Sequence, residues 1–432
     1  MSEFKVGQVR EMFPALVSTD EKQSPIFLDN PAGTQLPGTV IEAVGQAMTY
    51  AASNLGGMFP NSIRADEIWQ SSHEAIADML GASSWREIVV GPSMTTLTLH
   101  ISRSIGRTFN RGEEIIVTRM DHEGDISPWL LLAEDLGLVI KWLPFNQDTW
   151  QIEVDDLNAL LTDKTRLLAL NYASNLTGSI NNISELASAA RAAGALVYVD
   201  AVQLAPHRLL AVNELNCDFL ACSSYKFYGP HLGILWGRES VLADLDAYRC
   251  RCASDELSVR FETGTPQTEL LAGLEATVEY FQWLGEICGY SGSRRELIAG
   301  AYTAATDYEN RLTIKLIEGL NEIEGLRIHG ITDTSRIDDR VPTVSFTHAA
   351  VSPTEIAKTL AQSSIYAWSG HNYAYEVVKQ LGLDEEQGVL RLGIAQYNTE
   401  TEIDRTLEVL TGLLGPHKKP KSPNYKGVEC IA

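Results

Sequence analysis

A single lysine stands where an apolar segment runs into a turn. Residues 217–221 have the length and composition of a buried strand, and the stretch that follows carries Lys226 and then the chain-turning pair Gly229-Pro230. A lysine in such a place is costly unless it is paired or chemically used, because lysine is rarely buried without a partner. Lys226 is therefore either a side chain that reaches the surface or an amine that forms an imine with a carbonyl cofactor.

Polar residues also follow the other segments that are expected to be strands. They occur at five strand ends and comprise Ser93 and Thr95 with Met94 between them, Asp121, His122, Asn175, Asp200, Gln203, Ser223 and Tyr225. Each of them alone could be a helix cap, an ion-pair partner or an ordinary loop residue. Because ligands of open parallel sheets bind at the carboxyl ends of the strands, the set as a whole indicates a binding site beside Lys226.

The chemistry of this set suits pyridoxal 5'-phosphate. Lys226 would form the imine, and Asp200 would pair with the pyridinium nitrogen and so keep the ring an electron sink. Residues 93–95 open an expected helix, whose backbone N–H groups would hold the phosphate.

The remaining members of the set would complete the cofactor site. Ser223 and Tyr225 can add hydroxyl donors, and Asn175 and Gln203 can hydrogen-bond the ring hydroxyl. His122 could stack on the pyridine ring and shuttle protons, so Lys226 and His122 are the candidate catalytic residues.

The elements that must position these residues alternate between strands and helices. Strands that are apolar throughout are expected at 87–91, 114–118, 138–143, 167–171, 196–200 and 217–221, with helices between them, among them 67–80, 128–136 and 184–193. This pattern is typical of an α/β protein with a parallel sheet covered on both faces. Long helices follow at 268–286 and 296–322, and then a smaller α+β segment with strands at 341–346, 365–368 and 389–394.

These shifts in pattern divide the chain of 432 residues into four parts. We expect an N-terminal arm with a short helix, a large cofactor-binding domain, a small C-terminal domain and a flexible tail rich in lysine and proline, at 1–25, 26–290, 291–415 and 416–432.

Charge and composition exclude several classes of function. A formal net charge of -22 argues against binding to nucleic acid or to acidic membranes. No apolar stretch approaches the roughly 20 residues of a membrane span, and the N-terminus lacks a signal-peptide pattern, so we expect a cytoplasmic protein. No metal site is expected, because neither the histidines nor the cysteines have ligand spacing; the latter are Cys217, Cys222, Cys250, Cys252, Cys288 and Cys430.

Five motifs in a fixed order carry a resemblance to a known family. They are Met120-Asp121-His122-x-x-Asp125-Ile126-x-Pro128-Trp129, Ser174-Asn175-x-x-Gly178, Val199-Asp200-x-x-Gln203, Ser223-x-x-Lys226-x-x-Gly229-Pro230 and Phe261-Glu262-x-Gly264-Thr265-Pro266. The chain resembles the class V aminotransferase family of fold-type I pyridoxal-phosphate enzymes, over nearly its whole length. Within that family it is similar to the group II cysteine desulfurases and selenocysteine lyases.

The resemblance implies a mostly parallel seven-stranded sheet between helices, and it implies roles for individual residues. Lys226 is the Schiff-base lysine, Asp200 the pyridinium partner, His122 the stacking ring, and Asn175 and Gln203 the ring-hydroxyl contacts; Ser223, Met94 and Thr95 hold the phosphate. The resemblance also implies a homodimer in which Thr265 reaches the phosphate site of the other subunit. Arg391 matches the arginine that grips the α-carboxylate of the substrate, a task to which a bidentate guanidinium is suited.

One loop departs from the desulfurase pattern. In desulfurases an arginine precedes a loop that carries a nucleophilic cysteine, whereas here Trp368 takes the place of the arginine and Tyr373 that of the cysteine. Tyr225 also stands where the family usually has histidine. Ser369, His371 and Tyr373 are therefore candidates for substrate binding or proton transfer, unless this is merely a polar loop.

These features predict an enzyme that binds an amino acid through pyridoxal phosphate. A lyase-type reaction is expected, by β-elimination such as C–S cleavage or by related chemistry at Cβ. The alternatives are an aminotransferase, a desulfurase that uses a thiol from elsewhere such as Cys250 or Cys252, and a cofactor-bound assembly module without catalysis.

Overall fold

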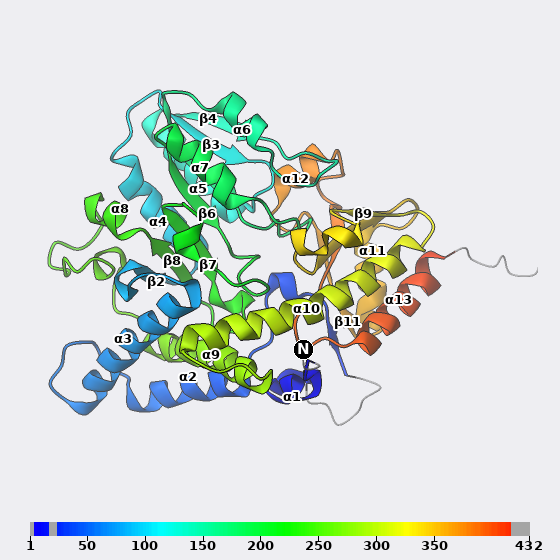
Figure 1. The fold of residues 1–432 in the computed structure, drawn as a ribbon, viewed down its shortest axis with the longest axis horizontal. Helices are drawn as coiled ribbons and strands as arrows, with labels where there is room; N and C mark the ends of the chain where they lie inside the picture. The colour runs from blue at the N-terminus through cyan, green and yellow to red at the C-terminus, as the bar shows by residue number, and fades with distance from the viewer. Residues whose placement is uncertain (1–3, 17–23, 416–432) are drawn as a thin grey trace, which may run out of the picture.

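The computed structural model describes residues 4–16 and 24–415 and contains two main sheets (Figure 1). The tail expected at 416–432 lies outside the described residues. In Figure 1 the larger sheet and its helices fill the left and top, while β9, α11 and α13 lie at the right. No helix in the described ranges is long and apolar enough to cross a membrane.

The larger sheet has seven strands in the order β2-β8-β7-β6-β5-β3-β4. The strands are β2 (Ile88–Gly91), β3 (Glu114–Thr118), β4 (Val139–Leu143), β5 (Thr165–Asn171), β6 (Leu196–Asp200), β7 (Phe219–Ser223) and β8 (Gly233–Gly237). Five of them, from β7 to β4, run parallel, and β8 is antiparallel to both of its neighbours. The expectation of a mostly parallel seven-stranded sheet in an α/β fold is therefore confirmed.

Successive residues of a central strand enter two different cores. Leu167 and Ala169 of β5 belong to the hydrophobic cluster under α4 (Met94–Gly106), α5 (Glu123–Leu136) and α8 (Glu239–Asp244). Leu168 and Leu170 belong to the cluster under α6 (Val154–Leu160) and α7 (Ile183–Ala192). Because side chains alternate across a strand, a strand buried on both faces must be apolar throughout, which explains why its sequence does not alternate.

The second sheet is antiparallel, with the order β12-β13-β10-β9. Its strands are β9 (Leu326–His329), β10 (Thr343–His348), β12 (Trp368–Gly370) and β13 (Val389–Gly393). The helices of this part of the chain are α11 (Pro353–Gln362), α12 (Tyr375–Gln380) and α13 (Glu400–Leu414). A two-stranded parallel sheet pairs β1 (Ile26–Phe27) with β11 (Ile365–Tyr366).

Long helices connect the two parts. Helix α9 (Thr268–Ile287) packs against α2 (Gly38–Tyr50), α3 (Pro60–Leu80) and α10 (Arg294–Asn321). Figure 1 shows α10 running along the lower side of the larger part towards α13, which it also contacts. The short helix α1 (Val6–Glu11) lies in the N-terminal arm. The predicted domain boundaries stay a prediction.

Two helices begin earlier than their sequences suggested. Helix α5 starts at Glu123 rather than Pro128, because His122 caps it through a bond that Nδ1 accepts from the Gly124 N–H, with Pro128 inside the helix. Helix α3 starts at Pro60 rather than Glu67, with proline at the first position, where its missing N–H costs nothing.

The sequence also concealed several elements. The segment expected as one strand at 365–368 is divided, since β11 pairs with β1 whereas β12 pairs with β13. Strands β8 and β9 and helices α6, α8 and α12 were not anticipated. Strand β8 is only five residues long and has glycine at both ends, which reads as a turn in isolation.

Candidate active site

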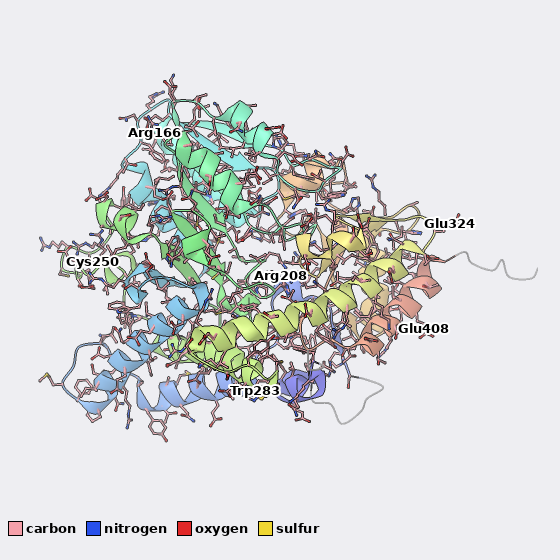
Figure 2. All side chains as sticks on the ribbon, viewed as in Figure 1. Arg166, Arg208, Cys250, Trp283, Glu324 and Glu408 are labelled. Carbon is pink, nitrogen blue, oxygen red and sulfur yellow. The ribbon has the colours of Figure 1, made fainter. Side chains whose placement is uncertain are left out.

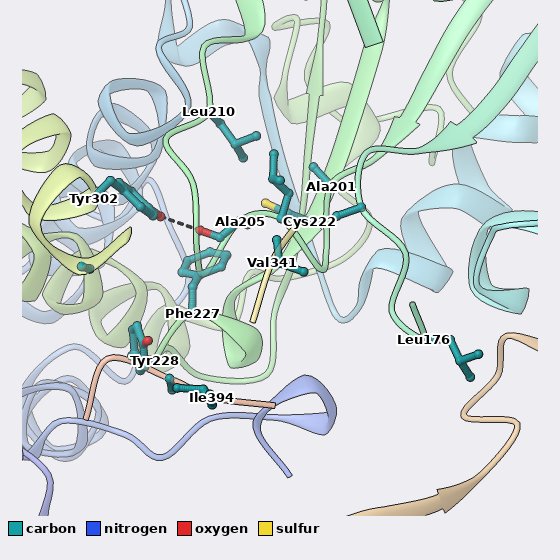
Figure 3. Packing of buried hydrophobic residues seen from close by; sticks show 14 of the residues in the cluster. Leu176, Ala201, Ala205, Leu210, Cys222, Phe227, Tyr228, Tyr302, Val341 and Ile394 are labelled. Carbon is teal, nitrogen blue, oxygen red and sulfur yellow. Dashed lines mark hydrogen bonds between the residues drawn. The ribbon is translucent and has the colours of Figure 1, made fainter. Parts of the chain in front are cut away.

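The backbone around Lys226 is held rigidly in the core. Strand β7 ends at Ser223, and a single 3₁₀ turn, Ser224–Lys226, carries the lysine out of the sheet. The residues that follow, Phe227 and Tyr228, are buried and pack with Cys222 in the core (Figure 3). The Lys226 amine donates to the carbonyl of Pro31, so the lysine points inward rather than reaching the surface.

Ten of the predicted residues line one cavity of about 80 Å³. These are Ser93, Met94, Thr95, His122, Asn175, Asp200, Gln203, Ser223, Tyr225 and Lys226. Asn171, Ala173 and Val202 complete the lining and were not anticipated. The strand ends meet here because β5, β6 and β7 are parallel neighbours in the sheet.

The surroundings of Lys226 lower the pKa of its amine and so favour the uncharged form. Burial, together with the positive charge of Arg391, lowers the pKa of the Lys226 amine to about 7, against the opposing attraction of Asp200. A substantial fraction of this amine is therefore uncharged near neutral pH, as a nucleophile or a base requires.

Asp200 lies at the end of β6 in a group of three buried carboxyls. Its Oδ1 accepts a hydrogen bond from the Val202 N–H at 2.8 Å. Burial raises the pKa of Asp200 to about 6, while the Val202 N–H and Lys226 act in the opposite direction. Burial also raises the pKa of Asp121 and of Asp125, helped by repulsion between the carboxylates. A positive charge in the cavity would relieve this cost.

His122 is an uncharged flat ring at the N-terminus of α5. Burial, and then the charges of Lys226, Arg391 and His371, lower the pKa of His122 to about 3. Its Nδ1 accepts from the Gly124 N–H at 2.9 Å, so Nε2 carries the proton. Tyr373 stacks on the ring with centroids 5.3 Å apart and planes 20° apart.

The start of α4 forms a cradle with open backbone N–H groups. Ser93 caps the helix by accepting from the Thr96 N–H at 3.1 Å. The turn lies so close to β8 that a Cβ on Gly233 would overlap the backbone of Ser93 and Met94. Gly233 is therefore a positioning residue that the sequence alone did not reveal. A helix start of this kind favours a phosphate group.

Three buried polar atoms at the site have no partner among the residues that the structure describes. They are Asn175 Oδ1, Gln203 Oε1 and Arg391 Nε. The other end of the Gln203 amide donates to Thr343 Oγ1 at 2.9 Å, and a reversed amide would instead present its NH₂ group to the cavity. Because unpaired buried polar groups are costly, these atoms indicate that a polar ligand completes the site. Together with the helix start and the amine, they fit pyridoxal phosphate.

A second, larger cavity of about 620 Å³ adjoins the first. It shares Thr95, His122, Asn175, Tyr225 and Lys226 with the first and adds Ala32, Trp368, Ser369, Gly370, His371, Asn372, Tyr373, Glu386 and Arg391. The buried Arg391 donates to the Asn175 carbonyl at 2.9 Å, and burial lowers the pKa of its guanidinium only to about 10. Arg391 therefore remains positively charged at neutral pH.

Hydrogen bonds hold the loop at 368–373, which departs from the desulfurase pattern, over His122. The Asn372 carbonyl accepts from Asn175 Nδ2, and the Tyr373 carbonyl accepts from the Glu123 N–H, both at 2.8 Å. Asn372 and Tyr373 both have positive φ angles, of 50° and 60°. The loop therefore has a defined shape in which Tyr373 covers His122.

Thr265 and the five cysteines within the described residues lie outside both cavities, and Cys430 lies outside the described residues. Thr265 lines a separate cavity of about 210 Å³ beside β2 and α4. Cys217 and Cys222 are buried, and burial raises the pKa of both thiols. Cys250 and Cys252 are exposed, and Figure 2 shows Cys250 at the left edge of the molecule. None of the described cysteines lines either cavity.

Comparison with known proteins agrees with the fold. Residues 26–406 match the model of the family described as aminotransferase class-V. The chain is 32% identical over 421 residues to the aminotransferase-like protein FGM3 of Gibberella zeae, covering 96% of this chain and 99% of that protein. It is 30% identical over 431 residues to a cysteine desulfurase of Yersinia pseudotuberculosis, covering 95% and 100%.

Solved structures give the same result. A cysteine desulfurase from Thermococcus onnurineus superposes with a TM-score of 0.84 at 27% identity, covering 96% of this chain and 99% of that one. The cysteine desulfurase CsdA of Escherichia coli superposes with a TM-score of 0.81 at 26% identity and the same coverage, 96% and 99%.

Proposed function

Because the chain belongs to the class V aminotransferase family of pyridoxal-phosphate-dependent enzymes, we propose that it breaks a bond at Cβ of an amino acid, as in β-elimination. The observation that carries this proposal is Lys226, whose amine has a pKa of about 7 and lies in the cavity with Asp200. Such an amine can take a proton from Cα at neutral pH and return it.

The cofactor residues differ in the part of the cofactor that each would bind. Lys226 would hold the aldehyde carbon, and Asp200 would hold the proton of the ring nitrogen. The N–H groups of Met94 and Thr95 with the Ser223 hydroxyl would bind the phosphate, with Tyr225 at the same end of the site. His122 would lie on the ring, and Asn175 and Gln203 would bind its hydroxyl. Pyridoxal phosphate, when bound, supplies an electron-withdrawing ring that stabilises negative charge at the substrate's Cα.

The substrate would be oriented by Arg391 and by the loop above His122. The Arg391 guanidinium has an unpaired Nε, which suits a bidentate contact with an α-carboxylate. Ser369, His371 and Tyr373 line the part of the cavity that would receive the side chain. Tyr373, stacked over His122, would also keep water from the reacting atoms.

The site favours a lyase reaction over desulfuration. A desulfurase transfers sulfur to a thiolate, and none of the described cysteines lines either cavity. A leaving group that departs directly from Cβ needs no such acceptor. Transamination would use the same residues and is distinguished by its product, an oxo acid formed only once per cofactor without an acceptor.

We also propose a homodimer in which Thr265 completes the partner's phosphate site. Support comes from the position of Thr265 in a cavity separate from this chain's own Lys226.

Product identification by mass spectrometry tests the proposed function. The protein is supplied with a panel of amino acids that includes cysteine, S-conjugates of cysteine, alanine, aspartate and basic amino acids. We expect repeated release of ammonia or of a fragment of the side chain. One oxo acid per active site would indicate transamination instead, and no product from any amino acid would contradict the proposal.

The cofactor assignment is tested separately with Lys226→Ala. We expect this variant to lose the visible absorbance of the purified protein, since no other amine in the cavity could hold the cofactor. Lys141→Ala is the control. Lys141 lies in the edge strand β4, where it pairs with Glu114, so this variant should retain the absorbance. A coloured Lys226→Ala variant with a cofactor-derived imine would refute the assignment.

A further inference from the structure

The second cavity is larger than a small amino acid requires. Its volume of about 620 Å³ extends from Lys226 and Arg391 to Trp368 and Glu386. The bound cofactor would fill the part of this space that is lined by the residues shared with the first cavity, which leaves the part beside Trp368 and Glu386 to the substrate. The size of the cavity therefore favours a long side chain.

Glu386 is the one carboxylate in the lining of this cavity. It lies in a turn that Asp384 holds, because Asp384 Oδ1 accepts from the N–H groups of Glu386 and Gln387, both at 2.9 Å. No hydrogen bond or ion pair of the Glu386 carboxylate is found within the described residues. Its neighbour Glu385, in contrast, accepts a hydrogen bond from the Tyr375 hydroxyl. The backbone of Glu386 is thus fixed while its charge is left available.

Two aromatic side chains flank the same space. Trp368 and Tyr373 are 52% and 64% exposed and both line the cavity. Large aromatic side chains with this much exposure commonly mark binding surfaces, and their ring faces attract cations. Trp368 is directly opposite Arg391 in the pairing of β12 with β13, which places it next to the expected carboxylate site.

The sequence separation of Glu386 and Arg391 limits how far apart the two charged groups can lie. Glu386 precedes Arg391 by five positions, so their Cα atoms are at most about 17 Å apart. Their side chains shorten the gap that a ligand between them must span. A net charge of -22 also draws cations towards the protein. The Lys226 amine, whose pKa is about 7, opposes a nearby cation less than an ordinary lysine would.

We infer that the substrate is an amino acid whose leaving group at Cβ carries a cationic end, an ammonium or a guanidinium. This cationic end lies against Trp368 and Tyr373 and pairs with Glu386 while Arg391 holds the α-carboxylate. This inference rests on the proposed function, because it requires an amino acid at Arg391.

Titration of the cofactor-loaded protein tests the inference. Arginine, its neutral isostere citrulline, lysine and alanine are added separately while the visible absorbance is followed. We expect arginine to bind at least about 10-fold more tightly than citrulline, since a charge-assisted contact is replaced by a neutral one of the same shape. Added salt should reduce this ratio, because the pair is partly exposed to solvent.

Two glutamate variants locate the cation. In Glu386→Gln, the dissociation constant for citrulline divided by that for arginine should fall to about 1. Glu385→Gln should leave this ratio unchanged. Equal binding of arginine and citrulline to the unaltered protein, or a ratio that survives in Glu386→Gln, would overturn the inference and leave the proposed function standing. A spectrum that responds to no amino acid at all would overturn the proposed function and this inference with it.

Discussion

At the scale of single residues, the site is governed by three charged groups that alter one another. Arg391 and burial lower the pKa of the Lys226 amine to about 7, and burial raises the pKa of Asp200 to about 6. The two pKa values thus move in opposite directions, and both shifts favour the uncharged form of the side chain. Pairs of groups whose protonation is set by their environment are typical of acid–base sites.

The first prediction concerns the pH dependence of cofactor capture. Cofactor-free protein should react with pyridoxal phosphate at a rate that rises with pH up to about 7 and then levels off, because only the neutral Lys226 amine attacks. The measurement is the appearance of visible absorbance after mixing at different pH values. Free N-acetyl-lysine is the control and should keep accelerating towards pH ~10. The same continued rise in the protein would show that Lys226 is not perturbed.

The second prediction concerns the proposed carboxylate clamp. Arg391→Gln should raise the KM for the substrate about 10- to 100-fold, the effect of losing a charge-assisted contact of about 1.5–3 kcal/mol. The cofactor absorbance should remain, since Lys226 and Asp200 are unchanged. Steady-state kinetics measure the effect, and Arg405→Gln is the control, because Arg405 bonds the Ser363 carbonyl away from both cavities. An unaltered KM in Arg391→Gln would remove Arg391 from the binding site.

At the scale of elements, the proposed phosphate site depends on a strand that contributes no polar group. Helix α4 begins against β8, and Gly233 leaves the space that the turn at Ser93 and Met94 occupies. The strand is antiparallel to β7, which carries the lysine turn, so one strand positions both ends of the cofactor site. Short connecting elements can thus be as important for geometry as the residues that touch the ligand.

The third prediction concerns this close approach. Gly233→Ala should displace the start of α4 and weaken cofactor binding by at least about 10-fold, the equivalent of one lost hydrogen bond to a charged group. Equilibrium titration of cofactor-free protein with pyridoxal phosphate measures it. The matched control is Gly237→Ala in the same strand, whose added Cβ would meet the Leu242 side chain at 2.7 Å.

The control separates general destabilisation from loss of the cradle. Both variants should lower the thermal midpoint, because both force their neighbours to move. Only Gly233→Ala should lose cofactor affinity. Equal affinities in the two variants would show that the start of α4 does not hold the phosphate.

At the scale of the whole molecule, the proposed substrate space is lined by residues from both parts of the chain. The first cavity is lined from the strand ends of the seven-stranded sheet, and the second adds β12, β13 and the turn before β13. The cofactor residues and the substrate residues therefore come from different parts of the chain. A change in the smaller part could alter the reaction without altering the cofactor site.

The fourth prediction concerns assembly. Sedimentation analysis should find two copies of the chain, and Thr265→Ala should weaken cofactor binding although Thr265 does not line the cavity that holds Lys226. Thr263→Ala is the control, since Thr263 lies in the same separate cavity. A monomer that retains full cofactor affinity would contradict the proposed role of Thr265.

The cofactor half of the site was accessible from the sequence because each residue has a local signal. Lys226 and Asp200 end apolar strands, and Ser93 opens a helix, so their positions follow from the rule that parallel strand ends meet at one edge. Only Arg391 and Thr265 came from the family motifs, and they line other cavities. The chemical roles of the strand-end residues stay predictions, whereas their gathering in one cavity is a property of the structure.

The substrate half of the site was decided by the tertiary structure. Glu386 lies in an acidic run that looks like an ordinary solvated turn, and Trp368 was noted only for the arginine that it replaces. Pairing of β12 with β13 brings Trp368 opposite Arg391, and the tertiary structure places both in the lining of the cavity that Lys226 also lines. Local patterns in the sequence were enough to predict the fold and the strand ends that line the first cavity. The chemistry of the substrate pocket depends on contacts between distant segments, which no local pattern encodes.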